Sequence, residues 1–246
     1  MQQSVSLSAM DTRDYWPTVY ALQRTLKTLD HINITKVYWC SDIPFPIKLS
    51  VPTQWIRIPK ITTQTWNYIC SKCCLKLLPK YVKEDFNIIV HDDGYAVNKS
   101  AWTNEFFNVD YIGAIVPANC GWHNSHLNQV GNGGFSMRSK KLYQAIAELD
   151  PTIEREEYHK DPLLADTALF REWLPEDLLL SVLYYEKLTK DYGIRFASIE
   201  LADQWSIELN FNSPWLGKSL GFHGKYGTHH HYGEILQSDH KKFSLI

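Results

Sequence analysis

The sequence lacks any long run of apolar residues. Its longest mostly apolar stretches, such as residues 178–185, fall far short of the ~20 residues that a membrane-spanning helix needs. The opening Met1-Gln2-Gln3-Ser4 carries no charged segment of the kind that begins a secretory signal. We therefore expect a soluble, cytoplasmic protein. Peripheral association with a membrane through another chain remains compatible with this expectation.

The chain also lacks an excess of positive charge. Its 25 basic and 27 acidic residues give a formal net charge of −2. Nucleic acid binding usually requires a basic field that neutralises phosphates. We therefore expect no nucleic acid partner.

The five cysteines do not form a complete zinc motif. An odd number of cysteines without a secretory signal favours reduced thiols. Cys70-x-x-Cys73-Cys74 has no second Cys-x-x-Cys pair, and it lies where apolar residues recur at helical spacing. We expect these thiols to pack in the core, with a metal or redox role as the alternative.

The chain of 246 residues is long enough for one large α/β domain. Its first 90 residues alternate apolar strands with amphipathic helices, which is typical of a mainly parallel sheet covered on both faces. Such sheets bind ligands at the carboxyl ends of their strands. The patterns predict strands at 5–7, 36–40, 55–58, 86–90, 111–115, 134–138 and 195–197, and helices at 15–29, 66–78, 140–149 and 175–188.

Two acids follow the strongest predicted strand, in the run His91-Asp92-Asp93-Gly94. Acids at a strand end are costly unless a cation pairs with them. A divalent ion that bridges a diphosphate is a natural partner, because Mg²⁺ and Mn²⁺ bind carboxylate and phosphate oxygens. The alternative is an Asp-Gly turn with a solvated acid.

Glycines cluster in Val130-Gly131-Asn132-Gly133-Gly134-Phe135-Ser136, but this is neither a dinucleotide fingerprint nor a P-loop. It does not open a helix after the first strand, and it lacks the Gly-Lys-Ser/Thr ending. We expect a backbone that bends tightly and presents N–H groups to a ligand, with a simple hairpin turn as the alternative.

Three further clusters carry groups suited to chemistry. Glu176 and Asp177 open a predicted helix, where they act either as dipole-favoured acids or as a general base and its partner. His223 lies between glycines in a loop and can reach a metal ion. Cys120-x-x-His123-x-x-His126 offers three zinc-type ligands without a fourth.

Five segments together resemble a bacterial and viral family of GT-A-like glycosyltransferases, most of whose members have no assigned function. The resemblance spans about residues 5–225 and is most specific in the glycine segment. The segments are His91-Asp92-Asp93-Gly94-Tyr95, Asp110-Tyr111-Ile112-Gly113-Ala114, Gly131-Asn132-Gly133-Gly134-Phe135-Ser136-Met137-Arg138, Glu176-Asp177 and Gly221-Phe222-His223-Gly224.

The resemblance implies a GT-A-like, Rossmann-related domain with a mainly parallel or mixed sheet flanked by helices. This single domain would cover residues 1–246, with a nucleotide-binding half at about 1–95 and an acceptor-binding half at about 96–246. The cofactors would be Mn²⁺ or Mg²⁺ and a UDP- or GDP-sugar donor. The acceptor would be a glycan or another hydroxyl compound.

The family pattern also implies roles for single residues. Asp93 matches the metal-binding acid of an Asp-x-Asp motif, although His91 replaces the first acid and leaves the number of ligands open. His223 matches a further metal ligand near the C-terminus. Asp177, with Glu176 as the alternative, matches the base of inverting members.

The remaining implied residues bind the donor or the acceptor. The loop after the first strand would contact base and ribose. The glycine segment would line the donor sugar or the acceptor, and three tryptophans are candidates for stacking on an acceptor sugar. The donor-binding candidates are Thr12, Arg13, Asp42, Asp92, Gly133, Gly134 and Ser136, and the tryptophans are Trp122, Trp173 and Trp215.

Two other functions compete with this hypothesis. A metal-dependent hydrolase would use His91, Asp92, Asp93 and His223, with His123 or His126 as an additional candidate, and would bind metal without a nucleotide. A non-catalytic carbohydrate-binding protein would bind sugar without a nucleotide or a metal, because a fold alone does not fix a function.

Overall fold

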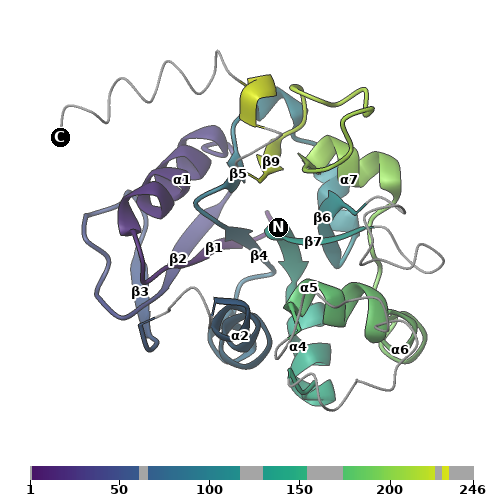
Figure 1. The fold of residues 1–246 in the computed structure, drawn as a ribbon, viewed down its shortest axis with the longest axis horizontal. Coiled ribbons are helices and arrows are strands. Elements are labelled where there is room, and N and C mark those ends of the chain that lie inside the picture. The colour runs from purple at the N-terminus through teal and green to yellow at the C-terminus, as the bar shows by residue number, and fades with distance from the viewer. Residues whose placement is uncertain (1, 61–65, 117–129, 154–173, 225–228, 233–246) are drawn as a thin grey trace.

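The computed structural model describes residues 2–60, 66–116, 130–153, 174–224 and 229–232. Its main sheet has six strands in the order β3-β2-β1-β4-β7-β6, and a small second sheet has the order β5-β9-β8 (Figure 1). The strands are β1 (Val5–Met10), β2 (Ile34–Ser41), β3 (Thr53–Arg57), β4 (Phe86–Val90), β5 (Gly94–Ala96), β6 (Tyr111–Ile115), β7 (Val130–Ser139), β8 (Ser206–Ile207) and β9 (Gly221–His223).

Helices cover both faces of the main sheet (Figure 1). In Figure 1, α1 and α7 lie on one side, and α2, α4, α5 and α6 lie on the opposite side. The helices are α1 (Tyr15–Thr28), α2 (Trp66–Lys72), α3 (Leu78–Tyr81), α4 (Lys140–Leu149), α5 (Glu176–Leu178), α6 (Tyr185–Asp191) and α7 (Ile199–Trp205). Among the described residues, no helix combines the length and apolarity that crossing a bilayer requires.

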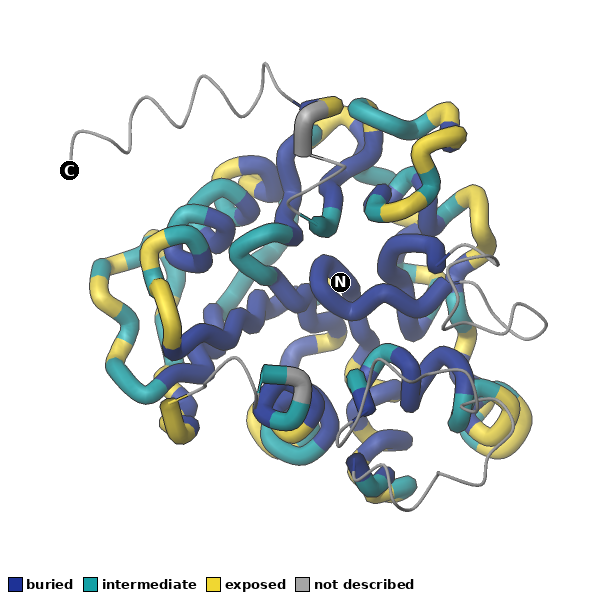
Figure 2. Tube along the Cα trace, in the orientation of Figure 1, coloured by how far each residue is buried: buried dark blue, intermediate teal, exposed yellow. Residues whose placement is uncertain are grey.

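The main sheet is mixed, in agreement with the predicted fold class. Strands β3, β2, β1 and β4 are parallel, whereas β7 pairs antiparallel with both β4 and β6. Every residue of β1, β4 and β7 is buried, because helices cover both faces of the sheet, as Figure 2 shows. The burial includes polar residues of these strands, such as Ser6, Ser8 and Asn87.

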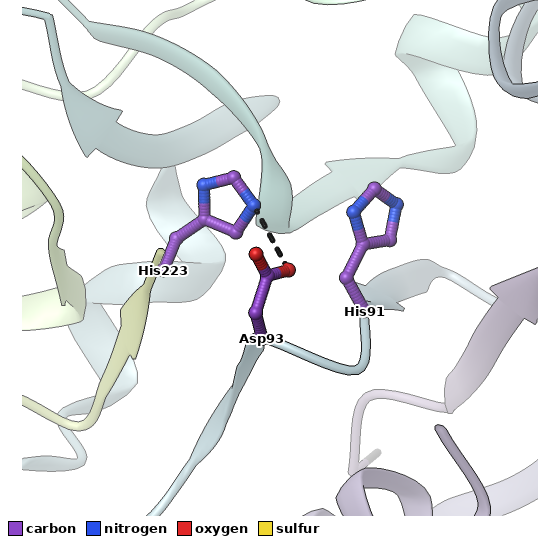
Figure 3. Close-up of side chains that lie close together, drawn as sticks. All are labelled: His91, Asp93 and His223. Carbon is purple, nitrogen blue, oxygen red and sulfur yellow. Dashed lines mark ion pairs between the residues drawn. The ribbon is translucent and has the colours of Figure 1, made fainter. Parts of the chain in front are cut away.

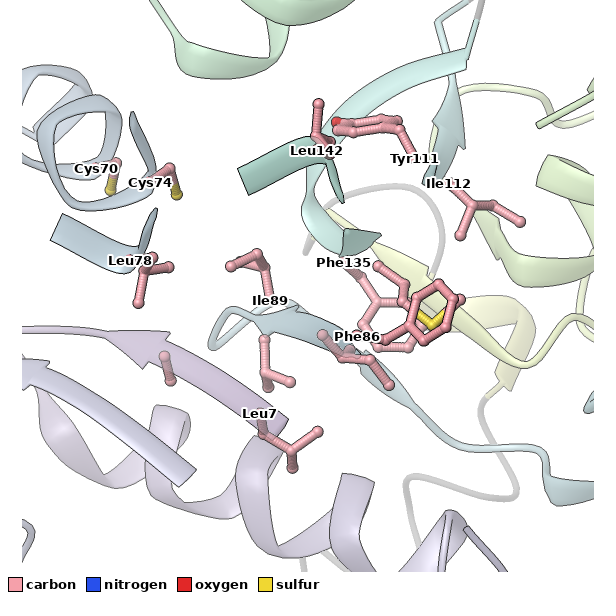
Figure 4. Close-up of a cluster of buried hydrophobic side chains, with 14 of the residues drawn as sticks. Leu7, Cys70, Cys74, Leu78, Phe86, Ile89, Tyr111, Ile112, Phe135 and Leu142 are labelled. Carbon is pink, nitrogen blue, oxygen red and sulfur yellow. The ribbon is translucent and has the colours of Figure 1, made fainter. Parts of the chain in front are cut away.

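The buried thiols pack in the core, as the sequence predicts. Cys70 and Cys74 join Leu7 and Ile89 in one buried cluster, drawn in Figure 4. Burial raises the pKa of both thiols well above the ordinary value, so they stay protonated. Among the described residues, no group of possible metal ligands includes a cysteine.

Three predicted elements differ from the structure. The cysteine helix does not end at Pro79 but continues to Tyr81, through a wide π-helical turn at Cys73–Leu77 that precedes the proline. Proline cannot donate to the carbonyl four residues earlier, and a wide turn accommodates this loss. The predicted helix 175–188 is likewise divided by a π-helical turn at Leu179–Leu183. Of the predicted strand 195–197, only Phe196 forms an isolated bridge, to Tyr111.

The glycine segment is a strand rather than a bent loop. The predicted strand at 134–138 is the second half of β7, which runs from Val130 to Ser139 with all ten residues buried. None of its glycines has a positive φ; among the described glycines, only Gly193, Gly217 and Gly224 do. The glycines therefore serve a purpose other than turning the chain.

Candidate functional site

The loops that follow β1, β2 and β4 meet at one edge of the sheet. Met10 pairs with Cys40, and Ala9 pairs with Val90, so these parallel strands end side by side. Asp42 and the segment Asp11–Arg13 therefore lie at the same edge as His91–Asp93. This is the edge at which open α/β sheets bind their ligands.

The loop after β1 is fixed by its own acid. Asp11 is buried, and its carboxylate accepts hydrogen bonds from Arg13 N at 2.8 Å and from Thr18 Oγ1 at 2.7 Å. Thr12 is fully buried. The predicted donor-binding residue Asp42, which follows β2, accepts a hydrogen bond from Tyr15 Oη at 3.0 Å.

Arg13 is linked to the loop after β4 by an aromatic ring. Its guanidinium carbon lies 3.7 Å from the ring centroid of Trp66, and the Trp66 ring lies edge-on to His91 with centroids 5.9 Å apart. A cation stacked on tryptophan keeps its N–H donors available at its edge. The Trp66 ring thus lies between Arg13 and His91, and Arg13 Nε also lies 3.7 Å from Asp11 Oδ1.

A tight turn and a strand pair bring His91, Asp93 and His223 together. His91 N donates to Gly94 O at 3.0 Å, and Gly94 N donates back to His91 O at 3.2 Å. Gly94 is then the cross-strand partner of His223 in the β5–β9 pair. This pairing places His223 next to a turn that lies 130 residues earlier in the chain.

The three side chains form a group able to hold one metal ion. One ligand atom from each lies within 4.8 Å of the others, and His223 Nε2 lies 3.5 Å from Asp93 Oδ1. Figure 3 shows the Asp93 carboxylate between the two imidazoles. Imidazoles suit divalent ions such as Zn²⁺ and Fe²⁺, and a carboxylate suits Mn²⁺ as well, so this mixed set of ligands is able to hold a first-row divalent metal ion. Asp92 lies in the same turn and is half-buried.

Positions 94 and 134 require glycine, because the His223 ring occupies the space that a Cβ atom would need. A Cβ at Gly134 would lie 1.9 Å from His223 Nε2, and one at Gly94 would lie 2.7 Å from His223 Cδ2. Real Cβ atoms essentially never approach this closely. Any side chain at position 134 would therefore displace the imidazole.

The two histidines have opposite pKa shifts. Burial and the neighbouring His223 lower the pKa of His91, so His91 is a neutral imidazole and a ready metal ligand. Burial alone would also lower the pKa of His223, but the carboxylates of Glu208 and Asp93 outweigh it and raise this pKa well above the ordinary value. The group therefore attracts a positive charge to His223.

A second polar cluster, formed by Arg138, Glu176 and Asp177, lies beside Gly133 of strand β7. Arg138 Nη2 donates to Glu176 Oε1 at 2.8 Å, with both side chains buried. Asp177 Oδ2 accepts from Gly133 N at 3.0 Å. A Cβ at Gly133 would lie 2.4 Å from Glu176 Oε1. Gly133 and Gly134 thus connect the carboxylate pair to the metal-ligand group.

The two carboxylates of this cluster differ in charge state. Burial alone would raise the pKa of Glu176, but the Arg138 guanidinium outweighs it and lowers this pKa. Burial and the adjacent Glu176 raise the pKa of Asp177 to about 7. Glu176 is therefore a fixed anion, whereas Asp177 exchanges its proton near neutral pH.

The remaining predicted residues have mixed positions. Ser136 is fully buried and donates to the Gly133 carbonyl at 2.9 Å, so it fixes the glycine backbone. Trp215 is partly buried against the core. Five candidates lie outside the described residues, namely Cys120, Trp122, His123, His126 and Trp173.

Sequence reasoning missed Trp66, Arg138 and Glu208 as parts of this site. Arg138 stands at the end of the glycine motif, in a predicted strand. A fully buried arginine is rare unless it is paired, so its position in that strand was the available signal. Trp66 and Glu208 carry no local signal, because their partners are distant in the sequence.

A family model described as "Protein of unknown function (DUF5672)" matches residues 67–223, which is more than half of the chain. The chain belongs to the DUF5672 family. The matched region contains β4 and the whole His91–Asp93–His223 group. A comparison with curated proteins finds no significant match.

Solved structures similar to this DUF5672 chain include two glycosyltransferases. A glycosyltransferase involved in the glycosylation of the major capsid of PBCV-1 has 10% identity and a TM-score of 0.52, covering 96% of this chain and 99% of that one. The galactosyltransferase LgtC, in complex with donor and acceptor sugar analogues, has 12% identity and a TM-score of 0.56, covering 96% and 95%. At this identity the likeness shows the fold alone, which is the GT-A-like fold that the resemblance predicted.

Proposed function

We propose that the protein is a metal-dependent glycosyltransferase that moves a sugar from a nucleoside diphosphate to an acceptor hydroxyl. The His91–Asp93–His223 group carries this proposal, because it lies at the ligand-binding edge of a GT-A-like sheet. A bound divalent ion there would neutralise the charge that develops on a leaving diphosphate. Arg13, stacked on the Trp66 ring that contacts His91, would supply a further cation for the same charge.

The donor nucleoside would lie over the ends of β1 and β2. Thr12, Arg13 and Asp42 closely follow these two strands, and Asp92 lies in the turn that carries Asp93. The backbone of Gly133 and Gly134 would adjoin the transferred sugar, because these residues lie between the two polar clusters. A Cβ at either position would clash with a side chain of one of these clusters, so only glycine leaves the backbone free to adjoin the sugar.

Asp177 is proposed as the base that takes the proton of the acceptor hydroxyl. Its pKa of about 7 suits a carboxylate that must hold a proton and release it near neutral pH. Glu176 is less suitable, because its carboxylate is committed to Arg138. Direct attack by the deprotonated acceptor gives inversion at the anomeric carbon, which NMR of the product measures.

The first experiment is calorimetric titration of UDP- and GDP-sugars in Mn²⁺ and then in EDTA. We expect binding that requires Mn²⁺ and is lost in Asp93→Ala. Asp191→Asn, an exposed acid on α6, is the control that should bind normally. Metal binding with no nucleotide-sugar affinity would favour a hydrolase, and sugar binding insensitive to Mn²⁺ would favour a carbohydrate-binding protein.

A further inference from the structure

Glu208 is brought to His223 by the small second sheet. Glu208 directly follows β8, and β8 pairs parallel with β9, with Ser206 opposite Gly221 and Ile207 opposite Phe222. The next position in this register sets Glu208 beside His223. The resemblance and the local sequence pattern assign no role to Glu208.

The Glu208 carboxylate contacts the His223 ring nitrogen that faces away from Asp93. His223 Nδ1 lies 3.1 Å from Glu208 Oε1, and His223 Nε2 lies 3.5 Å from Asp93 Oδ1. The Glu208 and His223 side chains are 17% and 16% exposed, so water screens their interaction only weakly. The other Glu208 oxygen, Oε2, accepts a hydrogen bond from the side-chain amide of Asn132.

This arrangement selects one form of the imidazole. A neutral imidazole has one N–H donor and one nitrogen that accepts, and an ionised carboxylate only accepts. Metal binding requires the neutral ring. Both ring nitrogens face a carboxylate, but Glu208 is the nearer, at 3.1 Å against 3.5 Å for Asp93, so the single proton of the neutral ring is favoured on Nδ1 and the lone pair on Nε2. Metal-ligating histidines are commonly oriented in this way by a carboxylate at the other ring nitrogen.

We propose that Glu208 is a positioning residue that holds His223 with Nε2 directed at the metal site, a role that rests on the proposed metal-dependent function. Asn132 extends the chain of contacts, because its amide holds Glu208 while its Oδ1 accepts from Gly134 N at 3.0 Å. Gly134 in turn lies against the His223 ring. Strand β7 thus fixes both the ring and the carboxylate that orients it.

Glu208→Gln tests the proposal with almost no change in size. Glutamine has one accepting oxygen, but His223 Nδ1–H and the Asn132 amide are two donors. If the glutamine oxygen faces Asn132, its amide donates to Nδ1, and the proton moves to Nε2, where it blocks the metal. The matched control is Glu148→Gln, an exposed glutamate on α4.

The first readout is Mn²⁺ affinity of the nucleotide-free protein, measured by calorimetry. We expect Glu208→Gln to weaken binding about 10–100-fold, the usual effect of losing an orienting partner. Glu148→Gln should match the wild type. Equal affinity of Glu208→Gln and wild type, or no Mn²⁺ binding by the wild type, would overturn the proposal.

The second readout is the His223 tautomer in long-range ¹H–¹⁵N spectra of the metal-free protein at alkaline pH, assigned by loss of the signal in His223→Ala. We expect the Nδ1–H form in the wild type and a shift to Nε2–H in Glu208→Gln. An Nε2–H wild type would overturn the proposal. These two readouts need no nucleotide, so wild-type protein that binds Mn²⁺ but no nucleotide sugar would refute the proposed function while the variants still decide the role of Glu208.

Discussion

The two polar clusters beside Gly133 and Gly134 handle buried charge in opposite ways. In the metal-ligand group, the acids Asp93 and Glu208 flank one histidine, and the second histidine is neutral. In the carboxylate cluster, Arg138 already neutralises Glu176, and Asp177 remains with a pKa of about 7.

This difference indicates which cluster awaits a ligand. Arg138 and Glu176 already neutralise each other within the protein, which offsets part of the cost of burying both charges. The metal-ligand group would be stabilised more by an external cation, because the carboxylates of Asp93 and Glu208 favour a positive charge at His223. One cluster therefore depends on the bound ion, and the other on the protein alone.

The largest effect on turnover is expected from Asp177→Asn. Loss of a general base typically lowers kcat about 10²–10⁴-fold, whereas Mn²⁺ affinity should not change. Transfer rates and calorimetry measure the two effects, with Asp191→Asn as the control. Normal transfer by Asp177→Asn would exclude Asp177 as the base and leave Glu176 as the alternative.

The largest effect on stability is expected from Arg138→Met. It leaves the Glu176 carboxylate buried without its partner, which should lower the free energy of unfolding by about 3–5 kcal/mol. The double variant Arg138→Met/Glu176→Met should regain most of this loss. Denaturant unfolding measures both, and equal stability of the single and double variants would contradict the assigned pairing.

Gly134→Ala should damage the metal-ligand group specifically. Its new Cβ would displace the His223 ring, and we expect Mn²⁺ affinity to fall about 10–100-fold, as when a ligand loses its orientation. Gly131→Ala is the matched control in the same strand, because its Cβ would meet Ser181 instead. It should cost stability but spare Mn²⁺ affinity; equal affinity losses in both variants would point to a general distortion of β7.

The smallest expected effect is a pH dependence set by Asp177. Because the base must be deprotonated, kcat should rise through pH 7 and fall about tenfold per pH unit below it. The folded pKa exceeds the unfolded value, so folded Asp177 retains a proton that the unfolded chain has lost. Its contribution to stability is therefore lost as pH rises from the ordinary carboxyl pKa to about 7. A kcat independent of pH between 6 and 8 would contradict this assignment.

Local patterns predicted the elements whose contacts are local. Helix α4 begins after Ser139, whose side chain accepts from Leu142 N at 3.0 Å, as the sequence indicates. The strand Phe86–Val90 is found with its predicted bounds. Where packing intervened, prediction was wrong, as for the helix that passes Pro79 and the glycine segment that became a buried strand.

The sequence by itself determined the acids at the end of β4 and the alternation that builds a parallel sheet, because both depend on neighbouring residues. The local pattern indicated His223 as a candidate metal ligand, but its association with Asp93 was implied only by the resemblance. Only the tertiary structure decided that Glu208 and Gly134 contact His223, that Asn132 holds Glu208, and that Arg138 rather than solvent neutralises Glu176. These contacts join residues far apart in the chain, and strand pairing, which no local pattern encodes, brings them together.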